Sequence, residues 1–268
     1  MMQMNFNKTQ LLAILPQRMR GEEMEDVLEI RLRLGKPPRF VTRSGWRDGR
    51  GAVEERDLAF VINAASRYSP WTAASQQEGY LTAPGGHRIG ICGSGAGDCI
   101  REVTSLCIRV ARDVSGIAAG LPLSGSLLIL GPPGSGKTTL LRDLIRKRSC
   151  RQTVSVVDER RELFPEGFGR GENTDVLSGV GKPKGIDMVL RAMGPQVIAM
   201  DEVTSFEDCA ALSRAAWCGV ELLATAHASS VLDLKERTVY RPLVETGLFS
   251  RAAVLDRERC WHLEEVGA

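Results

Sequence analysis

The sequence contains few of the residues that build metal sites and disulfide frameworks. Its 268 residues include 3 histidines and 7 cysteines, and the cysteines form no C-x-x-C pair and have no histidine partners at zinc spacing. The cysteine count is odd and scattered, in a chain long enough to form its own core. We therefore expect reduced thiols, as in a cytosolic protein, rather than a zinc site or a disulfide scaffold.

Long apolar stretches, internal repeats and low-complexity tracts are also absent. The segment Met1–Gln10 is polar and has no apolar signal core, and no apolar run approaches the length of a membrane span. We expect a cytoplasmic protein that meets a membrane only through partners. The net charge of +2 does not by itself require a nucleic-acid partner, although 28 of the 35 basic residues are arginine.

One segment is dense in glycine and lies between an apolar run and a helix-like stretch. Leu127–Leu130 precedes it, Thr139–Ile145 follows it, and the segment itself consists of Gly131, Pro132, Pro133, Gly134, Ser135, Gly136, Lys137 and Thr138. Strand, glycine loop and helix in this order form a P-loop, where backbone N–H groups and a helix N-terminus surround phosphate oxygens. We predict that the segment, with Thr139, binds a nucleoside triphosphate. Lys137 would reach the β- and γ-phosphates, and Thr138 would ligate Mg²⁺.

A second apolar run ends in two acidic residues. Val197–Met200 is followed by Asp201 and Glu202. Ligands bind at the carboxyl ends of parallel strands, so we expect both carboxylates to lie beside the P-loop. Asp201 would hold Mg²⁺ through water and Glu202 would polarise the attacking water. The alternative is a helix cap by Asp201 or an ordinary surface pair.

Two more apolar runs end in residues able to contribute to such a site. Val154–Val157 is followed by Asp158 and Glu159, whose carboxylates are candidates to orient water or metal, or else belong to a solvated loop. His227 follows the run Leu222–Thr225 and is a candidate sensor of the γ-phosphate, or else a structural histidine.

Hydrolysis also needs a cation where charge develops on the γ-phosphate. Arginine suits this role because its planar guanidinium stays charged and binds oxygens bidentately. The candidates are Arg88, Arg109, Arg160, Arg161 and Arg191. Most arginines are solvated or paired at surfaces, so the choice among these stays open.

The pattern changes at the small-residue segment Gly116–Gly125. Beyond it, short apolar runs alternate with helical stretches, which indicates an α/β domain with a mostly parallel sheet. We predict a smaller α+β N-terminal domain over residues 1–118, a linker over 119–125 and a P-loop domain over 126–268. A closing hairpin is predicted at Ala252–Leu255 and Cys260–Leu263.

The N-terminal half contains both the apolar spacing of helices and the apolar alternation of strands. Helical spacing predicts helices at Lys8–Leu15, Glu22–Ile30 and Glu54–Tyr68, and alternation predicts strands at Glu29–Leu34, Phe40–Arg43 and Leu106–Ala111.

Six segments together resemble the secretion-type ATPase superfamily and, within it, the stage III sporulation protein AA family. They are Glu29–Arg33 with Gly35–Pro37, Gly85–Gly90, Gly131–Thr138, Asp158–Arg160, Met200–Glu202 and Thr225–His227. The resemblance implies a RecA-like motor domain that uses ATP and Mg²⁺ in a ring, a hexamer, with nucleotide between the two domains and neighbouring subunits. It also implies membrane-embedded sporulation channel proteins as partners, between mother cell and forespore.

One departure from the superfamily is Asp201, where larger secretion ATPases usually carry glycine; it leaves open whether Glu202 or Glu159 activates water. Two other functions stay open: a RecA-like nucleic-acid translocase, although nucleic acid is not the expected partner, and a non-catalytic nucleotide-dependent scaffold. The signature of ABC subunits and the Asn-Lys-x-Asp motif of GTPases are not found.

Overall fold

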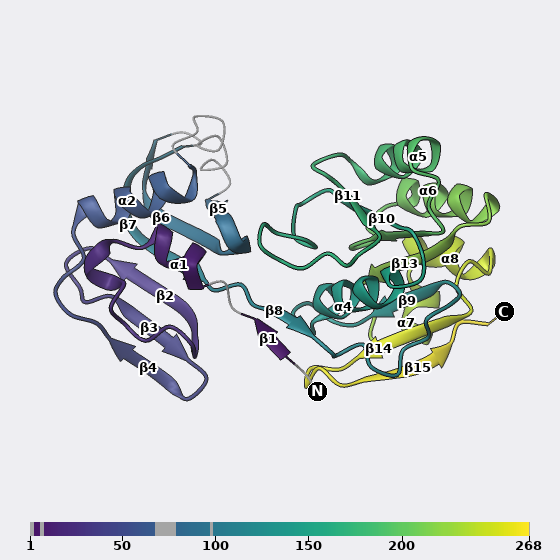
Figure 1. Ribbon diagram of the computed structural model, residues 1–268, viewed down its shortest axis with the longest axis horizontal. Helices are drawn as coiled ribbons and strands as arrows, with labels where there is room; N and C mark the ends of the chain where they lie inside the picture. Colours follow the sequence, from purple (N-terminus) through teal and green to yellow (C-terminus); the bar gives the residue numbers. More distant parts are fainter. Residues whose placement is uncertain (1–2, 6–7, 68–78, 97–98, 268) are drawn as a thin grey trace. The chain divides into compact units, whose positions relative to one another are not determined.

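The computed structural model describes residues 3–5, 8–67, 79–96 and 99–267 (Figure 1). The chain divides into two compact units. The N-terminal unit comprises Met4–Asp113 with Pro165–Phe168, and the P-loop unit comprises Met1–Gln3, Val114–Phe164 and Gly169–Ala268. A two-stranded sheet pairs β1 (Gln3–Asn5) with β8 (Asp113–Ser115), the segments in which the chain passes from one unit to the other.

A seven-stranded sheet forms the centre of the P-loop unit. Its order is β11 (Thr174–Ser178), β10 (Val154–Asp158), β12 (Val197–Met200), β13 (Glu221–Ala226), β9 (Leu127–Leu130), β14 (Arg251–Leu255) and β15 (Trp261–Glu265). Every neighbouring pair is parallel except the hairpin of β14 and β15. The predicted α/β fold, its apolar strands and its closing hairpin are confirmed.

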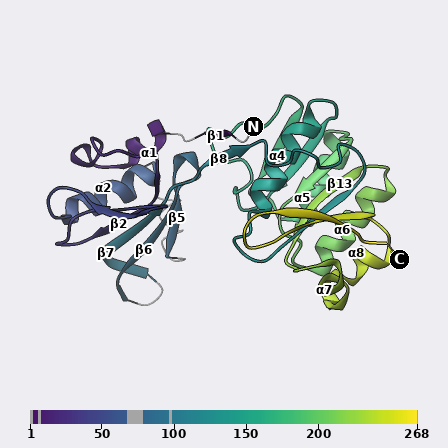
Figure 2. The same ribbon diagram turned by 90° about the horizontal axis from the view of Figure 1, so that it is seen from below.

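Helices cover both faces of this sheet because its central strands are apolar on both sides (Figure 2). On one face α4 (Lys137–Ser149) packs through Leu140 and Leu144 against Ile129 and Val156. The other face is covered by α5 (Lys182–Ala192), α6 (Phe206–Trp217), α7 (Val231–Glu236), the short η4 (Thr238–Tyr240) and α8 (Arg241–Glu245).

The strand register brings four strand ends to one edge. Val157 pairs with Met200, Met200 with Ala224, and Ala226 with Leu130. The residues that follow β10, β12, β13 and β9 are therefore neighbours, which is the arrangement expected at the ligand edge of a parallel sheet.

The N-terminal unit contains a six-stranded antiparallel sheet. Its order is β4 (Gly45–Asp48), β3 (Arg39–Thr42), β2 (Val27–Arg33), β7 (Cys99–Arg109), β6 (Arg88–Ala96) and β5 (Tyr80–Thr82). Two helices, α1 (Lys8–Ile14) and α2 (Glu55–Ala65), share one core with one face of the sheet, together with the short turns η1 (Gln17–Met19) and η3 (Pro84–Gly86). The predicted end of the second helix, Tyr68, lies outside the described residues.

The helix predicted at Glu22–Ile30 is wrong. This segment is a turn followed by the start of β2, and a register shift between Val27 and Glu29 interrupts the alternation. Val27 and Ile30 are consequently both buried although they are three residues apart, a spacing that imitates a helix face. Two edge strands, β4 and β11, were not predicted because neither contains a buried residue or an apolar alternation.

Candidate active site

Glycines shape the loop between β9 and α4. Gly134 and Gly136 have φ angles of +78° and +98°, in the left-handed region that favours glycine, and Gly136 directly precedes α4. No side chain caps this helix, so the N–H groups of its first turn stay open to an anion. Pro133 is exposed, whereas Ser135 is buried and its Oγ has no hydrogen-bond partner in the described part of the chain. A phosphate oxygen would supply the missing partner.

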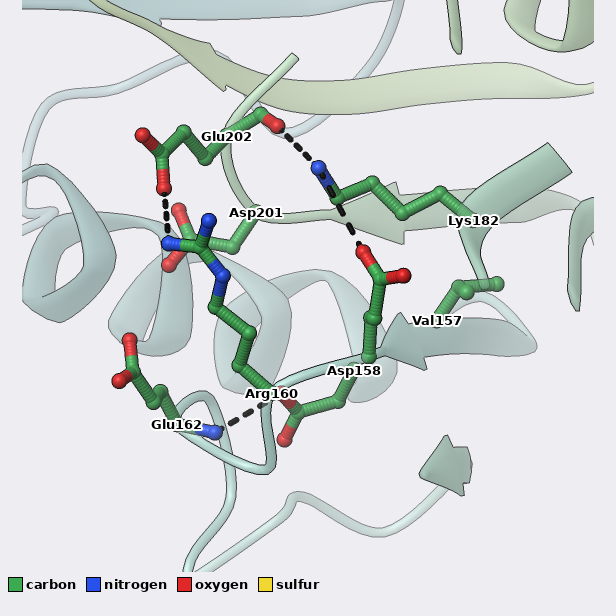
Figure 3. Close-up of a pocket in the computed structure, with 8 residues that line it drawn as sticks. Val157, Asp158, Arg160, Glu162, Lys182, Asp201 and Glu202 are labelled. Carbon is green, nitrogen blue, oxygen red and sulfur yellow. Dashed lines mark hydrogen bonds and ion pairs between the residues drawn. The ribbon is translucent and has the colours of Figure 1, made fainter. Parts of the chain in front are cut away.

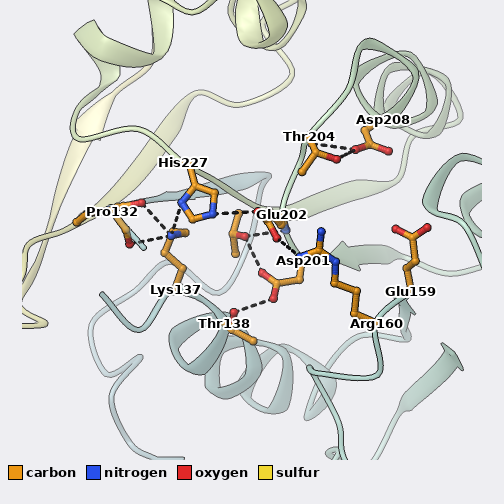
Figure 4. A network of polar contacts seen from close by, with 12 residues as sticks. Pro132, Lys137, Thr138, Glu159, Arg160, Asp201, Glu202, Thr204, Asp208 and His227 are labelled. Carbon is orange, nitrogen blue, oxygen red and sulfur yellow. Dashed lines mark hydrogen bonds and ion pairs between the residues drawn. The ribbon is translucent and has the colours of Figure 1, made fainter. Parts of the chain in front are cut away.

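Lys137 is 7% exposed and lies against the same loop. Its Nζ donates to the carbonyl oxygens of Gly131 (2.8 Å) and Pro132 (3.0 Å) and lies 3.1 Å from Nδ1 of His227 (Figure 4). Burial lowers the pKa of this ammonium, and two nearby carboxylates oppose that shift only in part. A buried cation held mainly by carbonyl dipoles is well placed to exchange them for phosphate oxygens.

Thr138 and Asp201 form a hydroxyl–carboxylate pair. Thr138 Oγ1 donates to Asp201 Oδ2 (2.7 Å), and Thr225 Oγ1 donates to Asp201 Oδ1 (2.6 Å); Thr139 follows, half-buried on the same helix turn. Asp201 does not cap the next helix, because Ser205 does. Hydroxyl and carboxylate oxygens fit Mg²⁺, whose shell is completed by water and phosphate oxygens. Among the described residues no three His, Cys, Asp or Glu side chains form a metal site of their own.

Glu202 has an unusual backbone. Its φ is +55°, a left-handed conformation that costs a non-glycine residue on the order of 1–3 kcal/mol. Its Oε1 lies 3.0 Å from Nε2 of His227, and its Oε2 accepts from Nη1 of Arg160 (2.8 Å). The Lys137 ammonium has no lone pair, so His227 accepts at Nδ1 and donates from Nε2 to Glu202. The predicted base, histidine and P-loop lysine are thus joined in one network.

The loop after β10 is held by a buried carboxylate and by a guanidinium from α4. Asp158 accepts from the N–H groups of Glu162 (2.9 Å), Leu163 (3.1 Å) and Phe164 (3.2 Å). Arg142 donates to the carbonyl oxygens of Glu162 (2.9 Å) and Leu163. The Asp158 carboxylate therefore stabilises this loop instead of orienting water or metal, and it fixes the base of the loop that carries Glu159 and Arg160.

A small pocket that is open to solvent lies beside the ends of β10 and β12 (Figure 3). It is lined by Val157, Asp158, Glu159, Arg160, Glu162, Lys182, Asp201 and Glu202. Lys182, the first residue of α5, was missed by sequence reasoning because a single lysine forms no pattern. The available signal is its position in the first turn of a helix, where the helix dipole disfavours a cation.

The other predicted arginines do not join this network. Arg191 is exposed in the last turn of α5, which leads to the start of β12 and so to the opposite edge of the sheet. Arg161 has a left-handed backbone (φ +60°) and is exposed. Arg88 and Arg109 belong to the N-terminal unit, where they stand opposite each other in the register of β6 and β7. The guanidinium of Arg88 stacks on Tyr80, 4.2 Å from the ring centre.

Comparison with known sequences decides the family. The family described as "Sporulation stage III, protein AA" matches residues 5–262. The chain belongs to the stage III sporulation protein AA family. The Stage III sporulation protein AA of Bacillus subtilis (strain 168) is 32% identical over 284 residues, which cover 93% of this chain and 91% of that protein. The predicted family resemblance is confirmed.

Solved structures of a pilus retraction motor and of an ATPase share the fold of this family member. The pilus retraction motor PilT, solved with bound ADP, aligns with a TM-score of 0.65 at 16% identity, over 85% of this chain and 74% of PilT. The ATPase DotB of Legionella pneumophila aligns with a TM-score of 0.58 at 17% identity, over 89% of this chain and 75% of DotB. At these identities the likeness shows the RecA-like ATPase fold.

The described helices include none that is both long and apolar enough to cross a membrane. Cys92, Cys107, Cys150, Cys209, Cys218 and Cys260 are free thiols.

Proposed function

We propose that this chain is a Mg²⁺-dependent ATPase and the motor of a secretion or channel complex in sporulation. The observation that carries the proposal is the convergence of functional groups at the ends of four adjacent strands. A phosphate-binding loop, a hydroxyl–carboxylate pair and a histidine-backed glutamate meet there. Phosphoryl transfer needs little more than such positioning and charge.

Each residue has a distinct role in this proposal. The amides of Gly131–Gly136 and the Lys137 ammonium bind the phosphates of ATP, and the Ser135 hydroxyl gains its missing partner. Thr138 and Asp201 would hold Mg²⁺, which would supply positive charge to neutralise the phosphates of ATP. His227 contacts both Lys137 and Glu202, so it connects the phosphate side of the site to the base.

Glu202 is the proposed general base. Its carboxylate contacts the histidine that faces the P-loop, whereas Glu159 lies on the far side of the pocket, 3.8 Å from the ammonium of Lys182. Arg160 pairs with Glu202 in this structure, so binding of the γ-phosphate offers Arg160 a second anionic partner. An arginine that moves towards the phosphate would free the carboxylate to accept a proton from water.

We further propose that the chain acts as a hexameric ring in the mother-cell cytosol, docked on membrane-embedded sporulation channel proteins. Support comes from the family, whose Bacillus subtilis member is named for sporulation, and from the fold shared with the motor PilT. The test measures the mass of the assembly with and without Mg²⁺-ATP, together with the ATPase rate against protein concentration. A ring predicts specific activity that rises steeply with concentration; constant specific activity from a monomer contradicts it.

Arg88 and Arg109 are the proposed arginines that a neighbouring copy contributes to catalysis. Either alanine variant, mixed with Lys137→Ala, should recover activity at mixed interfaces, because one copy supplies the intact P-loop and the other the intact arginine. No recovery at any mixing ratio would contradict action between copies.

A further inference from the structure

Lys182 has a buried ammonium beside the Glu202 loop, and it is 6% exposed. Its closest contact is the backbone carbonyl oxygen of Glu202, at 2.6 Å (Figure 3). Three side chains lie farther away: Thr204 Oγ1 at 3.3 Å, Asp208 at 3.5 Å and Glu159 at 3.8 Å. Burial disfavours an unpaired ammonium, and the start of a helix disfavours a cation, so these contacts must hold Lys182 where it is.

The backbone of Glu202 depends on side chains to keep its left-handed conformation. Its N–H donates to Thr225 Oγ1 (2.8 Å), and its carbonyl oxygen accepts from Lys182. The next N–H, of Val203, donates to the carbonyl oxygen of Thr225 (2.8 Å). The peptide group before Glu202 is therefore held by β13, and the peptide group after it is held by β13 at its N–H and by the lysine at the start of α5 at its carbonyl oxygen.

This conformation sets the direction in which the Glu202 side chain leaves the chain. With φ at +55° the carboxylate reaches Nε2 of His227 and Nη1 of Arg160. An unrestrained glutamate would relax to negative φ, because L-residues with a Cβ avoid the left-handed region. Relaxation would turn the Cα–Cβ bond and move the carboxylate away from the histidine.

We propose that Lys182 is a positioning residue for Glu202: its ammonium holds the Glu202 carbonyl and so aims the carboxylate at the site of water attack. This inference rests on the proposed function, since it takes Glu202 as the general base. Lys182 also lies near Asp208, but pairing with this carboxylate is the lesser of its two roles. Asp208 already accepts hydrogen bonds from the N–H (2.9 Å) and the hydroxyl (3.1 Å) of Thr204.

The test compares Lys182→Met with Lys184→Met, whose side chain is exposed two residues along the same helix. Displacing a reacting group by about 1 Å costs on the order of 100-fold in rate, so kcat of Lys182→Met should fall by about 10- to 100-fold. The Kd for Mg²⁺-ATP should change by less than about 3-fold, because the P-loop contacts are untouched. Lys182→Gln, which keeps an N–H donor without the charge, should recover part of kcat. Lys184→Met should match the wild type.

A double variant separates positioning from a merely structural effect. If Lys182 acts through Glu202, then Lys182→Met in a Glu202→Gln background should cause no further loss of kcat. A full additional loss there, or an unchanged kcat in the single variant, would overturn the inference. If thermal unfolding shows that Lys182→Met is not folded, Lys182→Gln replaces it in the same comparison of kcat with and without Glu202→Gln. Absence of turnover in the wild type would instead overturn the proposed function, and this inference with it.

Discussion

The P-loop unit and the N-terminal unit are both built around a sheet, but they bury different polar groups. In the P-loop unit helices cover both faces, and charged side chains such as Lys137, Asp158 and Lys182 are buried at the carboxyl edge of the strands. In the N-terminal unit the charges on β6 and β7, including Arg88 and Arg109, are exposed, and the buried polar groups include a neutral histidine, His87, and one carboxylate, Asp57, which lies on a helix and pairs with Arg18.

The difference shows where each architecture can place a reaction. A doubly covered parallel sheet has one edge at which several loops start, so charges on those loops meet each other away from water and hold each other in fixed directions. A sheet packed on one face sends every second side chain to solvent, where charges are screened and move freely. Catalysis is therefore expected in the P-loop unit, and the following substitutions test that expectation.

The largest effect is expected from Glu202→Gln. Loss of the general base should lower kcat by about 10²- to 10⁴-fold while ATP stays bound. Steady-state turnover and nucleotide affinity measure the two quantities. Glu159→Gln is the matched comparison: a greater loss of kcat there would transfer the base role to Glu159.

Lys137→Ala should weaken Mg²⁺-ATP binding by about 100-fold or more, because two or more charge-assisted bonds to phosphate are lost. Isothermal titration with a non-hydrolysable ATP analogue measures the affinity. Lys184→Ala removes an exposed lysine from the same unit and should leave the affinity unchanged. Equal affinities for Lys137→Ala and the wild type would remove the P-loop assignment.

His87 predicts a pH dependence confined to the N-terminal unit. Its Nδ1 accepts from the N–H of Ala111 (3.1 Å), and burial lowers its pKa from 6.5 to about 4. Below about pH 6.5 His87 is protonated in the unfolded chain but stays neutral in the folded chain, so the free energy of unfolding decreases as the pH falls towards 4. The loss between about pH 7.5 and about pH 5 should be about 2 kcal/mol.

Hydrogen exchange of β6 and β7 at the two pH values measures this loss. His87→Gln should flatten the pH dependence, whereas His262→Gln, which replaces an exposed histidine, should leave it as in the wild type. The same slope in His87→Gln and the wild type would contradict the assignment.

Asp143→Asn should have the smallest effect, and on stability alone. Asp143 is buried in α4 and accepts from the N–H groups of Gly116 (3.0 Å) and Ala118 (2.7 Å), away from the nucleotide site. Losing one of these bonds should lower the free energy of unfolding by about 1–3 kcal/mol without changing kcat. Denaturant unfolding and turnover give both values. A fall in kcat without loss of stability would contradict the purely structural role assigned to Asp143.

Much of the P-loop unit could be predicted from the sequence because its strands are fully apolar and its glycine loop has a required order. The same register that aligns β9, β10, β12 and β13 then explains why the end of β12, with Asp201 and Glu202, and the end of β13, with His227, lie beside Lys137 and Thr138 of the P-loop. These residues were expected at the site because each lies within two residues of the end of a predicted strand.

The remaining features depend on contacts that no local pattern encodes. The bulge in β2 gave Val27 and Ile30 a helix-like spacing, and the edge strand β11 has no apolar alternation. Asp158 follows a strand as Asp201 does, yet its carboxylate bonds its own loop. Lys182 enters the site only because α5 starts beside the end of β12. This contact is part of the tertiary structure, and no local sequence pattern encodes it.

The central claim is that this edge of the sheet hydrolyses ATP, and phosphate release by the purified full-length chain tests it most directly. The account predicts phosphate release that requires Mg²⁺, stops with EDTA and is lost in Lys137→Ala. Phosphate release that is equal in Lys137→Ala and the wild type, or none from a wild-type chain that is folded and supplied with Mg²⁺-ATP, would contradict it.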